Sequence, residues 1–270
     1  MSERELRELL DGAVAAARAG GEVLRRRYGT LRPCEVDEKG KRDFVTAVDR
    51  ESEEAVLRLL GERFPGTAIL AEESGGAGEG PGLRWVVDPL DGTTNYIHGY
   101  PCFAVSVGCE RDGVPVAGAV WDPHGGVLFT AARGLGAARN GEPVRVTRCA
   151  SLADSLLVTG FPFRSMDRMD RYLLCFEELM RGTSGIRRDG SAALDMCYVA
   201  CGWYDGFWEM GLSRWDLCAG TVVLEEAGGI ATDFVGLRGR HLATGDIIAG
   251  NPLLHPRVLA VVRSHYGPDA

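Results

Sequence analysis

The sequence is constrained most by an acidic turn that directly follows an apolar run. Trp85–Val87 predicts a buried strand, which delivers Asp88 at its end. Pro89 and Gly92 then favour a tight turn. On such a turn Asp88 and Asp91 can converge on one point, although they lie three positions apart. Buried carboxylates are costly unless a cation compensates them, so the chain is predicted to fold around a positively charged ligand here.

The same turn supplies further oxygen ligands. The backbone carbonyl between the two carboxylates is released from any strand ladder, and Thr93 adds a hydroxyl. Thr93–Asn95 can open a helix, whose N–H groups suit a phosphate. This set of hard oxygens suits Mg²⁺, which retains waters and takes phosphate oxygens as ligands. Asp91 and Gly92 alone are an ordinary turn dipeptide, so the prediction depends on the complete string.

Two further acidic sites lie at the ends of predicted elements. Glu72 and Glu73 follow a short predicted strand, and Asp216 begins a predicted apolar helix. Each has a plain structural interpretation as well, because Glu72 and Glu73 fit a solvated turn and Asp216 fits a helix N-cap. A single carboxylate at the edge of an element decides little. These residues become candidates only through the pattern that they form with the acidic turn.

The pattern of predicted elements changes near residue 150. Before it, two helices and a β-rich stretch with hairpin dipeptides are expected, and after it strands and helices alternate. This predicts a mixed α/β protein (α+β in some schemes), in which subdomain 1–150 carries metal-binding motifs and subdomain 151–270 completes one active site. Residues 35–42 and 75–82 are expected to be loops. Helices are expected at 6–28, 49–63, 171–180, 190–201, 216–226 and after Pro252, and strands at 68–70, 85–87, 103–108, 114–121, 127–131, 156–159, 204–209, 230–233 and 247–249.

Charge and composition disfavour several classes of protein. The formal net charge of −8 argues against generic binding to nucleic acid or to an anionic membrane. No stretch approaches about 18 consecutive apolar residues, and the charged N-terminus lacks an apolar signal core, so a cytoplasmic protein is expected. There is no P-loop motif and no GxSxG elbow. The five histidines lack metal-ligand spacing, so kinase, serine hydrolase and zinc chemistry are all disfavoured.

Six motifs extend the acidic turn into a pattern that spans nearly the whole chain. They are DFVTAVD at 43–49, EES at 72–74, DPLDGTTN at 88–95, GSAA at 190–193, EMG at 209–211 and WDLCAG at 215–220. The motifs at 88–95 and 215–220 are specific and together leave little room for coincidence. In this order and spacing, the motifs resemble those of the inositol monophosphatase family. The resemblance implies the layered αβαβα sandwich of the sugar phosphatases.

The resemblance also implies a magnesium site that several segments of the chain share. Glu72, Asp88 and the carbonyl of Leu90 would hold a first Mg²⁺. Asp88, Asp91 and Asp216 would hold a second, and two or three ions in all are expected. The family relation further implies inhibition by lithium and a homodimer.

Catalytic and substrate-binding roles follow from the same resemblance. Thr93, supported by Asp49, would orient and activate a water, and Glu72 is counted with them as catalytic. The backbone N–H groups of Gly92 and Thr93 would contact the phosphate. Because metal ions neutralise the phosphate, no covalent phospho-enzyme is required. Further substrate contacts are expected from Asp91, Gly190, Ser191, Ala192, Glu209 and Asp216.

The favoured reaction is Mg²⁺-dependent hydrolysis of inositol 1-phosphate to inositol and phosphate. Proteins that share these motifs also act on histidinol phosphate, fructose bisphosphate or nucleotide 3′-phosphates, so these substrates stay open. Ser213 and Arg214 are expected to face the substrate region and to influence which substrate is accepted. A regulatory protein that associates with RNA or the transcription machinery is an alternative from another class, although the acidic balance argues against direct nucleic-acid binding.

Two groups of cations have more than one interpretation. The polar loop Glu35–Arg42 is either a solvated face or a lid that brings positive charge to the phosphate through Lys39, Lys41 and Arg42. Arg187 and Arg188 fit an anionic substrate, a partner subunit or ordinary surface ion pairs.

Overall fold

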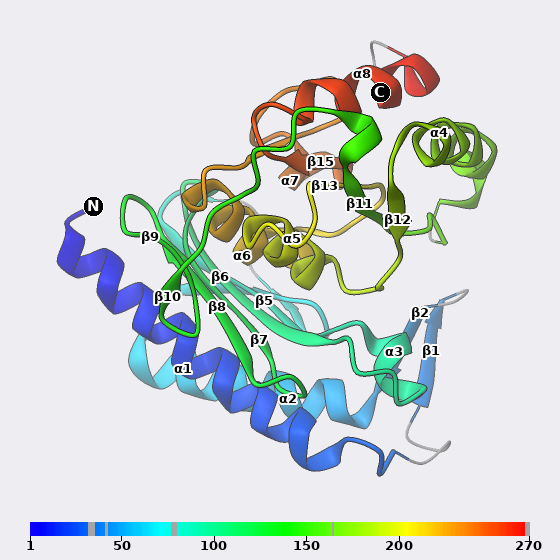
Figure 1. The fold of residues 1–270 in the computed structure, drawn as a ribbon. Coiled ribbons are helices and arrows are strands. Elements are labelled where there is room, and N and C mark those ends of the chain that lie inside the picture. Colours follow the sequence, from blue (N-terminus) through cyan, green and yellow to red (C-terminus); the bar gives the residue numbers. More distant parts are fainter. Residues whose placement is uncertain (32–35, 41–42, 77–79, 164, 268–270) are drawn as a thin grey trace.

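The protein folds into five stacked layers of helix and sheet. The computed structural model describes residues 1–31, 36–40, 43–76, 80–163 and 165–267. The layers are, in order, a helix pair, a large sheet, a second helix pair, a small sheet and a third helix pair (Figure 1). The mixed α/β fold and its αβαβα layering are therefore confirmed. Within the described ranges, no helix is long and apolar enough to cross a membrane.

Helices α1 (Glu3–Arg27) and α2 (Ala47–Arg63) form the outer layer on one face of the large sheet. Both begin with a capping box, in which the Ser2 or Thr46 side chain accepts a backbone N–H of the first turn. Their apolar faces pack on alternate residues of the strands beneath them and form one continuous core with these residues. The helix predicted at 6–28 and the one predicted at 49–63 are both present.

The large sheet has eight strands in the order β10-β9-β8-β7-β6-β5-β3-β4. Its neighbouring strands are antiparallel, except that β3 and β5 are parallel. Asp112 and Gly113 both have positive φ between β6 and β7, as a type I′ hairpin turn requires. The strands are β3 Ala68–Ala71, β4 Gly75–Gly76, β5 Leu83–Asp91, β6 Ala104–Arg111, β7 Val114–Asp122, β8 Val127–Ala132, β9 Gly136–Arg139 and β10 Glu142–Pro143.

Helices α5 (Ala192–Ala200) and α6 (Arg214–Glu226) form the middle layer. Two glycines, Gly108 of β6 and Gly118 of β7, lie opposite each other and let α6 lie directly on the sheet. A Cβ at Gly118 would come within 2.8 Å of the Ala219 Cα in α6, a distance that packed atoms do not tolerate. This close approach brings the first turn of α6 to the end of β5.

The small sheet has five strands in the order β12-β11-β13-β15-β14. Strand β11 is parallel to β12 and β13, whereas β15 is antiparallel to β13 and β14. The middle helices cover one face of this sheet, and α4 and α8 cover the other around a separate apolar core. These elements are β11 Leu156–Thr159, β12 Gly185–Arg187, β13 Gly206–Glu209, β14 Ile230–Thr232, β15 Ile247–Gly250, α4 Met169–Gly182, α7 His241–Thr244 and α8 His255–Tyr266.

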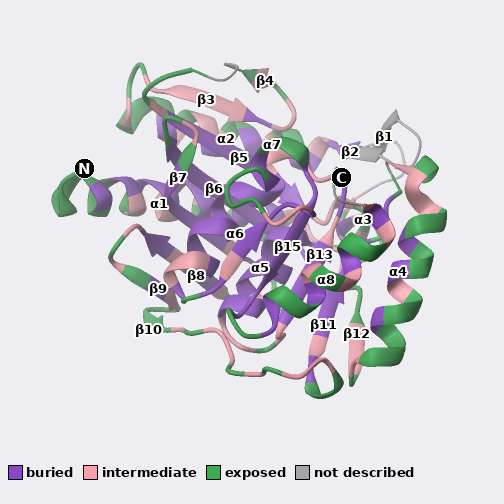
Figure 2. Ribbon diagram, turned by 90° about the horizontal axis from the view of Figure 1, so that it is seen from above, coloured by how far each residue is buried: buried purple, intermediate pink, exposed green. Residues whose placement is uncertain are grey.

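Buried residues concentrate in the central strands and the middle helices (Figure 2). The prediction of a loop at 35–42 is wrong for residues 36–40, because β1 (Val36–Gly40) pairs antiparallel with β2 (Asp43–Thr46). Such a ribbon forms through backbone hydrogen bonds, so a charged strand gives no apolar alternation that would reveal it. Gly75–Gly76 likewise pairs with β3 instead of belonging to a loop. The candidate lid cations Lys41 and Arg42 lie outside the described residues.

The glycine contact beneath α6 predicts a stability effect. Gly118→Ala is expected to lower the free energy of unfolding by about 1–3 kcal/mol, because its Cβ forces α6 away from the sheet. Urea titration with and without Mg²⁺ measures this loss. The same substitution at Gly61, which lies on the exposed side of α2 with open space around it, serves as the control and is expected to be neutral or stabilising by about 0.5–1 kcal/mol. Equal effects of the two substitutions would contradict the close-packing account.

Candidate active site

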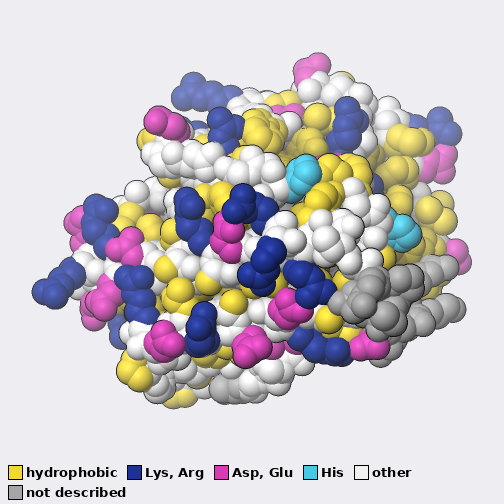
Figure 3. Space-filling model, turned by 90° about the horizontal axis from the view of Figure 1, so that it is seen from below, with side chains coloured by type: hydrophobic (Ala, Val, Ile, Leu, Met, Phe, Trp, Pro, Cys, Tyr) yellow, Lys and Arg dark blue, Asp and Glu magenta, His cyan; other side chains and the backbone are white. Residues whose placement is uncertain are grey.

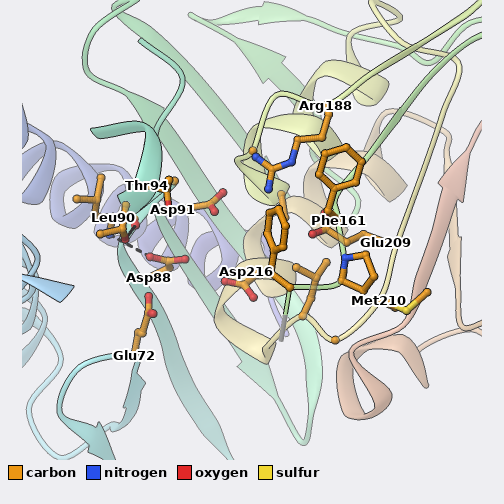
Figure 4. A pocket seen from close by; sticks show the side chains of 18 residues that line it. Glu72, Asp88, Leu90, Asp91, Thr94, Phe161, Arg188, Glu209, Met210 and Asp216 are labelled. Carbon is orange, nitrogen blue, oxygen red and sulfur yellow. Dashed lines mark hydrogen bonds between the residues drawn. The ribbon is translucent and has the colours of Figure 1, made fainter. Parts of the chain in front are cut away.

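The candidate active site is a cavity of about 160 Å³ that lies where the end of β5 meets the small sheet. Acidic residues of β5, α6 and the segment after β3 line one side, and residues that follow β11, β12 and β13 line the other (Figure 4). Most of the residues that the sequence and its resemblance single out come together here: Glu72, Asp88, Leu90, Asp91, Gly92, Thr93, Gly190, Ala192, Glu209 and Asp216. Asp49 and Ser191 lie behind this lining.

A bulge in β5 brings its two acidic residues to one face of the sheet. Asp88 and Asp91 lie opposite two β6 residues that are only two positions apart, so β5 has one extra residue in this interval. In a regular strand, residues three apart point to opposite faces, and the extra residue corrects this. The Leu90 N–H donates to Asp88 Oδ1 over 3.0 Å. The turn that the sequence predicts is therefore a bulge within a strand.

Asp216 approaches these residues from the first turn of α6. The N-cap of α6 is Ser213, whose N–H donates to Asp216 Oδ2 over 2.7 Å in a capping box. Asp216 is therefore not the N-cap itself. The hydrogen bond fixes one oxygen of Asp216 against the helix while the residue also lines the cavity.

Arg214 and Ser213 do not line the cavity, which corrects the expectation that they face the substrate region. Arg214 Nε donates to Glu110 Oε2 over 2.8 Å, and Arg84 Nε donates to Glu110 Oε1 over 2.7 Å. This largely buried Arg–Glu–Arg network joins the start of α6 to β5 and β6. It holds the first turn of α6, and with it Asp216, against the large sheet.

Asp88, Asp91 and Asp216 form a buried group that we call the carboxylate cluster. Each residue offers one carboxylate oxygen, and these three oxygens lie within 4.8 Å of one another. Burial raises the pKa of Asp88 well above its usual range, and the neighbouring carboxylates of Glu72, Asp91 and Asp216 raise it further. Burial and Asp216 raise the pKa of Asp91 to about 7. Such a group is stable in its ionised form only with a cation, and its hard oxygens suit a divalent one.

The orientation of Asp91 is fixed from the opposite side of the cavity. Ser191 Oγ donates to Asp91 Oδ2 over 2.6 Å, and the Ala193 N–H donates to the same oxygen over 2.8 Å. Asn95 Nδ2 donates to the Asp189 carbonyl over 2.8 Å and ties this turn to the start of α3 (Thr93–Ile97). The contacts join the two halves of the chain at the site.

Thr93 and Asp49 form a hydrogen-bonded pair beside the cluster. Thr93 Oγ1 lies 3.1 Å from Asp49 Oδ1 and 3.0 Å from the Leu90 carbonyl oxygen, and its single proton can be donated to either acceptor. Asp49 Oδ2 accepts the Thr46 N–H over 2.9 Å in the capping box of α2. Burial raises the pKa of Asp49 to about 6, although its hydrogen bonds with Thr46 oppose the shift. Asp49 is therefore both part of a helix cap and the partner of a cavity residue.

Gly92 precedes α3 in a left-handed conformation with φ of 94°. A Cβ at this position would lie 2.9 Å from the Cys102 carbonyl oxygen, so only glycine lets the chain pass from the bulge into α3.

The residue motifs did not identify part of the far wall of the cavity. Phe161, Pro162, Phe163, Arg188 and Leu212 line it in addition to the residues of the motifs. Most of them follow short strands of the small sheet, and β12, which precedes Arg188, has only three residues and no apolar periodicity. The sequence left the roles of Arg187 and Arg188 open. The structure places Arg188 in the cavity, while Arg187 does not line it.

A layered αβαβα fold with converging buried carboxylates beside a polar cavity is typical of the metal-dependent sugar phosphatases. Comparisons with known proteins point to the same class. The model of the inositol monophosphatase family matches residues 5–266. Nus factor SuhB of Pseudomonas aeruginosa is 46% identical over 98% of this chain and 99% of its own length. The fructose-1,6-bisphosphatase/inositol-1-monophosphatase of Aquifex aeolicus is 42% identical over 96% and 97%.

Comparison with solved structures shows similarity to the same family. Extragenic suppressor protein SuhB of Bartonella henselae superposes with a TM-score of 0.90 at 40% identity and covers 94% of this chain and 98% of its own. The inositol monophosphatase of Anabaena superposes with a TM-score of 0.85 at 41% identity and covers 96% and 97%. The chain belongs to the inositol monophosphatase family.

The raised pKa of Asp91 predicts how the metal-free protein responds to pH. A carboxyl with a raised pKa in the folded state contributes stability that is present below its unfolded pKa, about 3.9, and is lost as the pH rises through about 7. The melting temperature of chelator-treated protein should therefore fall across this window, and Mg²⁺ should reverse the fall.

Asp91→Asn tests the assignment, because it removes this titration and should make the fall of the melting temperature shallower, while Asp49, whose pKa is raised to about 6, still titrates. Asp154→Asn changes an exposed carboxylate far from the cavity lining and serves as the control, which should follow the wild type. Parallel curves for wild type and Asp91→Asn would show that the cluster does not titrate in this way.

Proposed function

We propose that this protein is a Mg²⁺-dependent phosphatase that hydrolyses a phosphate monoester of a small polyol, with inositol 1-phosphate as its preferred substrate. The observation that carries the proposal is the carboxylate cluster, in which three buried acids each present an oxygen to one point beside the cavity. Membership of the inositol monophosphatase family supports this class of reaction.

Two sets of oxygen ligands would hold Mg²⁺ in the cavity. Glu72, Asp88 and the Leu90 carbonyl would hold one ion, and Asp88, Asp91 and Asp216 would hold another. When bound, the ions would neutralise the phosphate oxygens, lower the pKa of the attacking water and stabilise the leaving oxygen. The donors fit this role because all are hard oxygens and because the cluster resists ionisation without a cation.

Thr93 and Asp49 would orient the attacking water and receive its proton. The Thr93 hydroxyl can donate its single proton to Asp49 Oδ1, so its lone pairs stay available to accept a proton from water. The pKa of Asp49, raised to about 6, lies close to neutrality and suits a general base that acts through Thr93. Glu72 would support the same step from the other side of Asp88.

The remaining residues would bind the phosphate and the alcohol. The backbone N–H groups of Gly92 and Thr93 would contact the phosphate. Carboxylates and backbone groups would accept or donate hydrogen bonds with the alcohol hydroxyls, and Ser191 would act through Asp91, to which it donates. The substrate-binding set is Asp91, Gly190, Ser191, Ala192, Glu209 and Asp216. Inhibition by lithium and a homodimer stay predictions from the family relation, and a cytoplasmic location stays a prediction from the sequence.

The names of two relatives suggest alternatives to this substrate and to this function. The Aquifex aeolicus relative is named for fructose 1,6-bisphosphate as well as inositol 1-phosphate, so this bisphosphate is the second candidate substrate, ahead of histidinol phosphate. The Pseudomonas aeruginosa relative is named a Nus factor, which raises a regulatory role in transcription. In the described part of the face that α1 and α2 form, arginine and acidic side chains are intermixed (Figure 3). RNA capture that survives Asp88→Asn would support the regulatory role.

Asp88→Asn should reduce Mg²⁺-dependent phosphate release from inositol 1-phosphate to the protein-free background, because it removes a carboxylate that both proposed metal sites share. The measurement is phosphate release with and without chelator. Glu22→Gln, on the exposed surface of α1, is the control and should keep wild-type activity. Wild-type activity that persists without divalent metal would refute the mechanism.

Thr93→Val should lower kcat by about 100- to 10,000-fold, because it removes the hydroxyl that links the water to Asp49. Thr93→Ser keeps the hydroxyl and should recover most of this loss. Steady-state kinetics at saturating Mg²⁺ separate the effect on kcat from that on KM. Equal losses in the two variants would mean that the hydroxyl alone does not account for the role of Thr93.

A further inference from the structure

Two segments that leave neighbouring strands form much of the cavity wall opposite the carboxylate cluster. Strands β11 and β13 are parallel, so their carboxyl ends lie at the same edge of the small sheet. We call the residues that follow them the β11 arm (161–163 and 165–168) and the β13 arm (210–212). Residues 161–163 and the whole β13 arm line the cavity (Figure 4). The position of one arm relative to the other therefore sets the shape of this side of the cavity.

The β11 arm contains two successive backbone turns. The Ser165 N–H donates to the Pro162 carbonyl over 3.0 Å, and the Arg168 N–H donates to the Ser165 carbonyl over 3.0 Å. These bonds link Arg168, which directly precedes α4, to the residues that line the cavity. Ser165 also meets the β13 arm, because a Cβ at Gly211 would come within 2.9 Å of Ser165 Oγ.

One carboxylate, that of Asp246, binds both arms. Asp246 directly precedes β15, which pairs antiparallel with β13. Arg168 Nη1 donates to Asp246 Oδ1 over 2.9 Å, and Arg168 Nη2 donates to Oδ2 over 2.6 Å. Asp246 Oδ1 also accepts the Gly211 N–H over 3.1 Å. A bidentate pair between arginine and a carboxylate fixes the relative orientation of the two groups, so Asp246 couples the two arms.

The surroundings of this pair favour a single geometry. The Asp246 side chain is only 8% exposed, and that of Arg168 is 28% exposed. The guanidinium carbon lies 5.3 Å from the ring centre of Tyr266 and 5.9 Å from that of Phe234, two residues of the core beneath α4 and α8. Tyr266 Oη also donates to Met210 Sδ of the β13 arm over 3.7 Å. An exposed ion pair contributes little, whereas a shielded bidentate pair packed on aromatic rings is held in place.

The pair acts on the cavity only indirectly, because neither Arg168 nor Asp246 lines it. The β13 arm leads directly into the start of α6, which carries Asp216. That start is held separately, because Arg214 binds Glu110 of the large sheet. Loss of the Arg168–Asp246 pair is therefore expected to displace the arms and to leave the carboxylate cluster in place.

We propose that the Arg168–Asp246 pair is a positioning element that sets the distance between the two arms, and with it the affinity for the alcohol part of the substrate. The two residues touch neither substrate nor metal and act through the arms. A displacement of the arms by about 0.5 Å is enough to weaken hydrogen bonds to hydroxyl groups. This inference rests on the proposed phosphatase function and adds to it the residues that tune recognition of the alcohol.

The kinetic test uses Arg168→Gln and Asp246→Asn, which each remove the bidentate ion pair. Each should raise KM for inositol 1-phosphate about 10-fold and change kcat by less than a factor of about 3. The inhibition constant of inorganic phosphate, which has no alcohol part, should stay within a factor of about 3 in both variants. The double variant should lose no more than the weaker-binding single variant, because the two residues act as a unit.

Arg181→Gln is the matched control, because it removes an exposed ion pair with Glu177 on the same helix, α4. It should leave all three constants unchanged. Arg168→Lys keeps the charge without the planar fork and should give a KM between those of wild type and Arg168→Gln. If KM and the inhibition constant of phosphate rise together, the pair supports the whole site and the positioning role is refuted. An unchanged KM refutes it as well.

Hydrogen exchange separates this inference from the proposed function, because it requires no turnover. Deuterium uptake is measured by mass spectrometry for metal-free wild type and Arg168→Gln. The substitution at 168 should speed exchange in the peptide that contains Gly211 about 10-fold, while peptides of α1 stay unchanged. Faster exchange supports the coupling even if the wild type hydrolyses no phosphate ester, an outcome that would overturn the phosphatase proposal alone. Equal exchange at Gly211 in the two proteins overturns the coupling.

Discussion

The rest of this structure depends on the mutual repulsion of three buried carboxylates. Asp88, Asp91 and Asp216 lie within a few ångströms of one another in surroundings that raise the pKa of both Asp88 and Asp91. Such a cluster opposes folding at neutral pH unless a cation or bound protons offset its charge. The surrounding layers must therefore supply enough apolar burial to keep the three segments together. The three separate apolar cores on the faces of the two sheets provide that burial.

Two backbone features turn this burial into a defined geometry. The bulge in β5 lets residues three apart point the same way, and the glycine pair beneath α6 lets a helix approach the sheet more closely than side chains would allow. The Arg84–Glu110–Arg214 network then fixes the start of α6. Each feature is local, yet all three must be present before Asp216 can meet Asp88.

Much of the site is readable in the sequence because its residues follow directly on strongly apolar elements. The run ending at Asp88 and the apolar helix beginning near Asp216 are recognisable from periodicity, and the order of the motifs connects them through the family resemblance. The bulge was not predictable, because Pro89 and Gly92 are as compatible with a turn as with an irregular strand. Arg214 was misplaced because a long side chain can reach either way from the first turn of a helix. Strands β1 and β12 were missed because short or charged strands form through backbone pairing alone.

The two walls of the cavity are held by different kinds of force, and this difference bears on how specificity is set. On the acidic wall, hydrogen bonds from backbone or buried groups fix one oxygen each of Asp88, Asp91 and Asp216, so the position of the cluster depends on the fold itself. On the far wall, the contacts that hold Arg188 among the described residues are with the aromatic faces of Phe161 and Phe163. Arg188 is also exposed, so a substitution there is expected to cost little stability. Under the proposed function, the wall that would bind the metal ions can therefore stay constant while the far wall varies with the alcohol that is accepted.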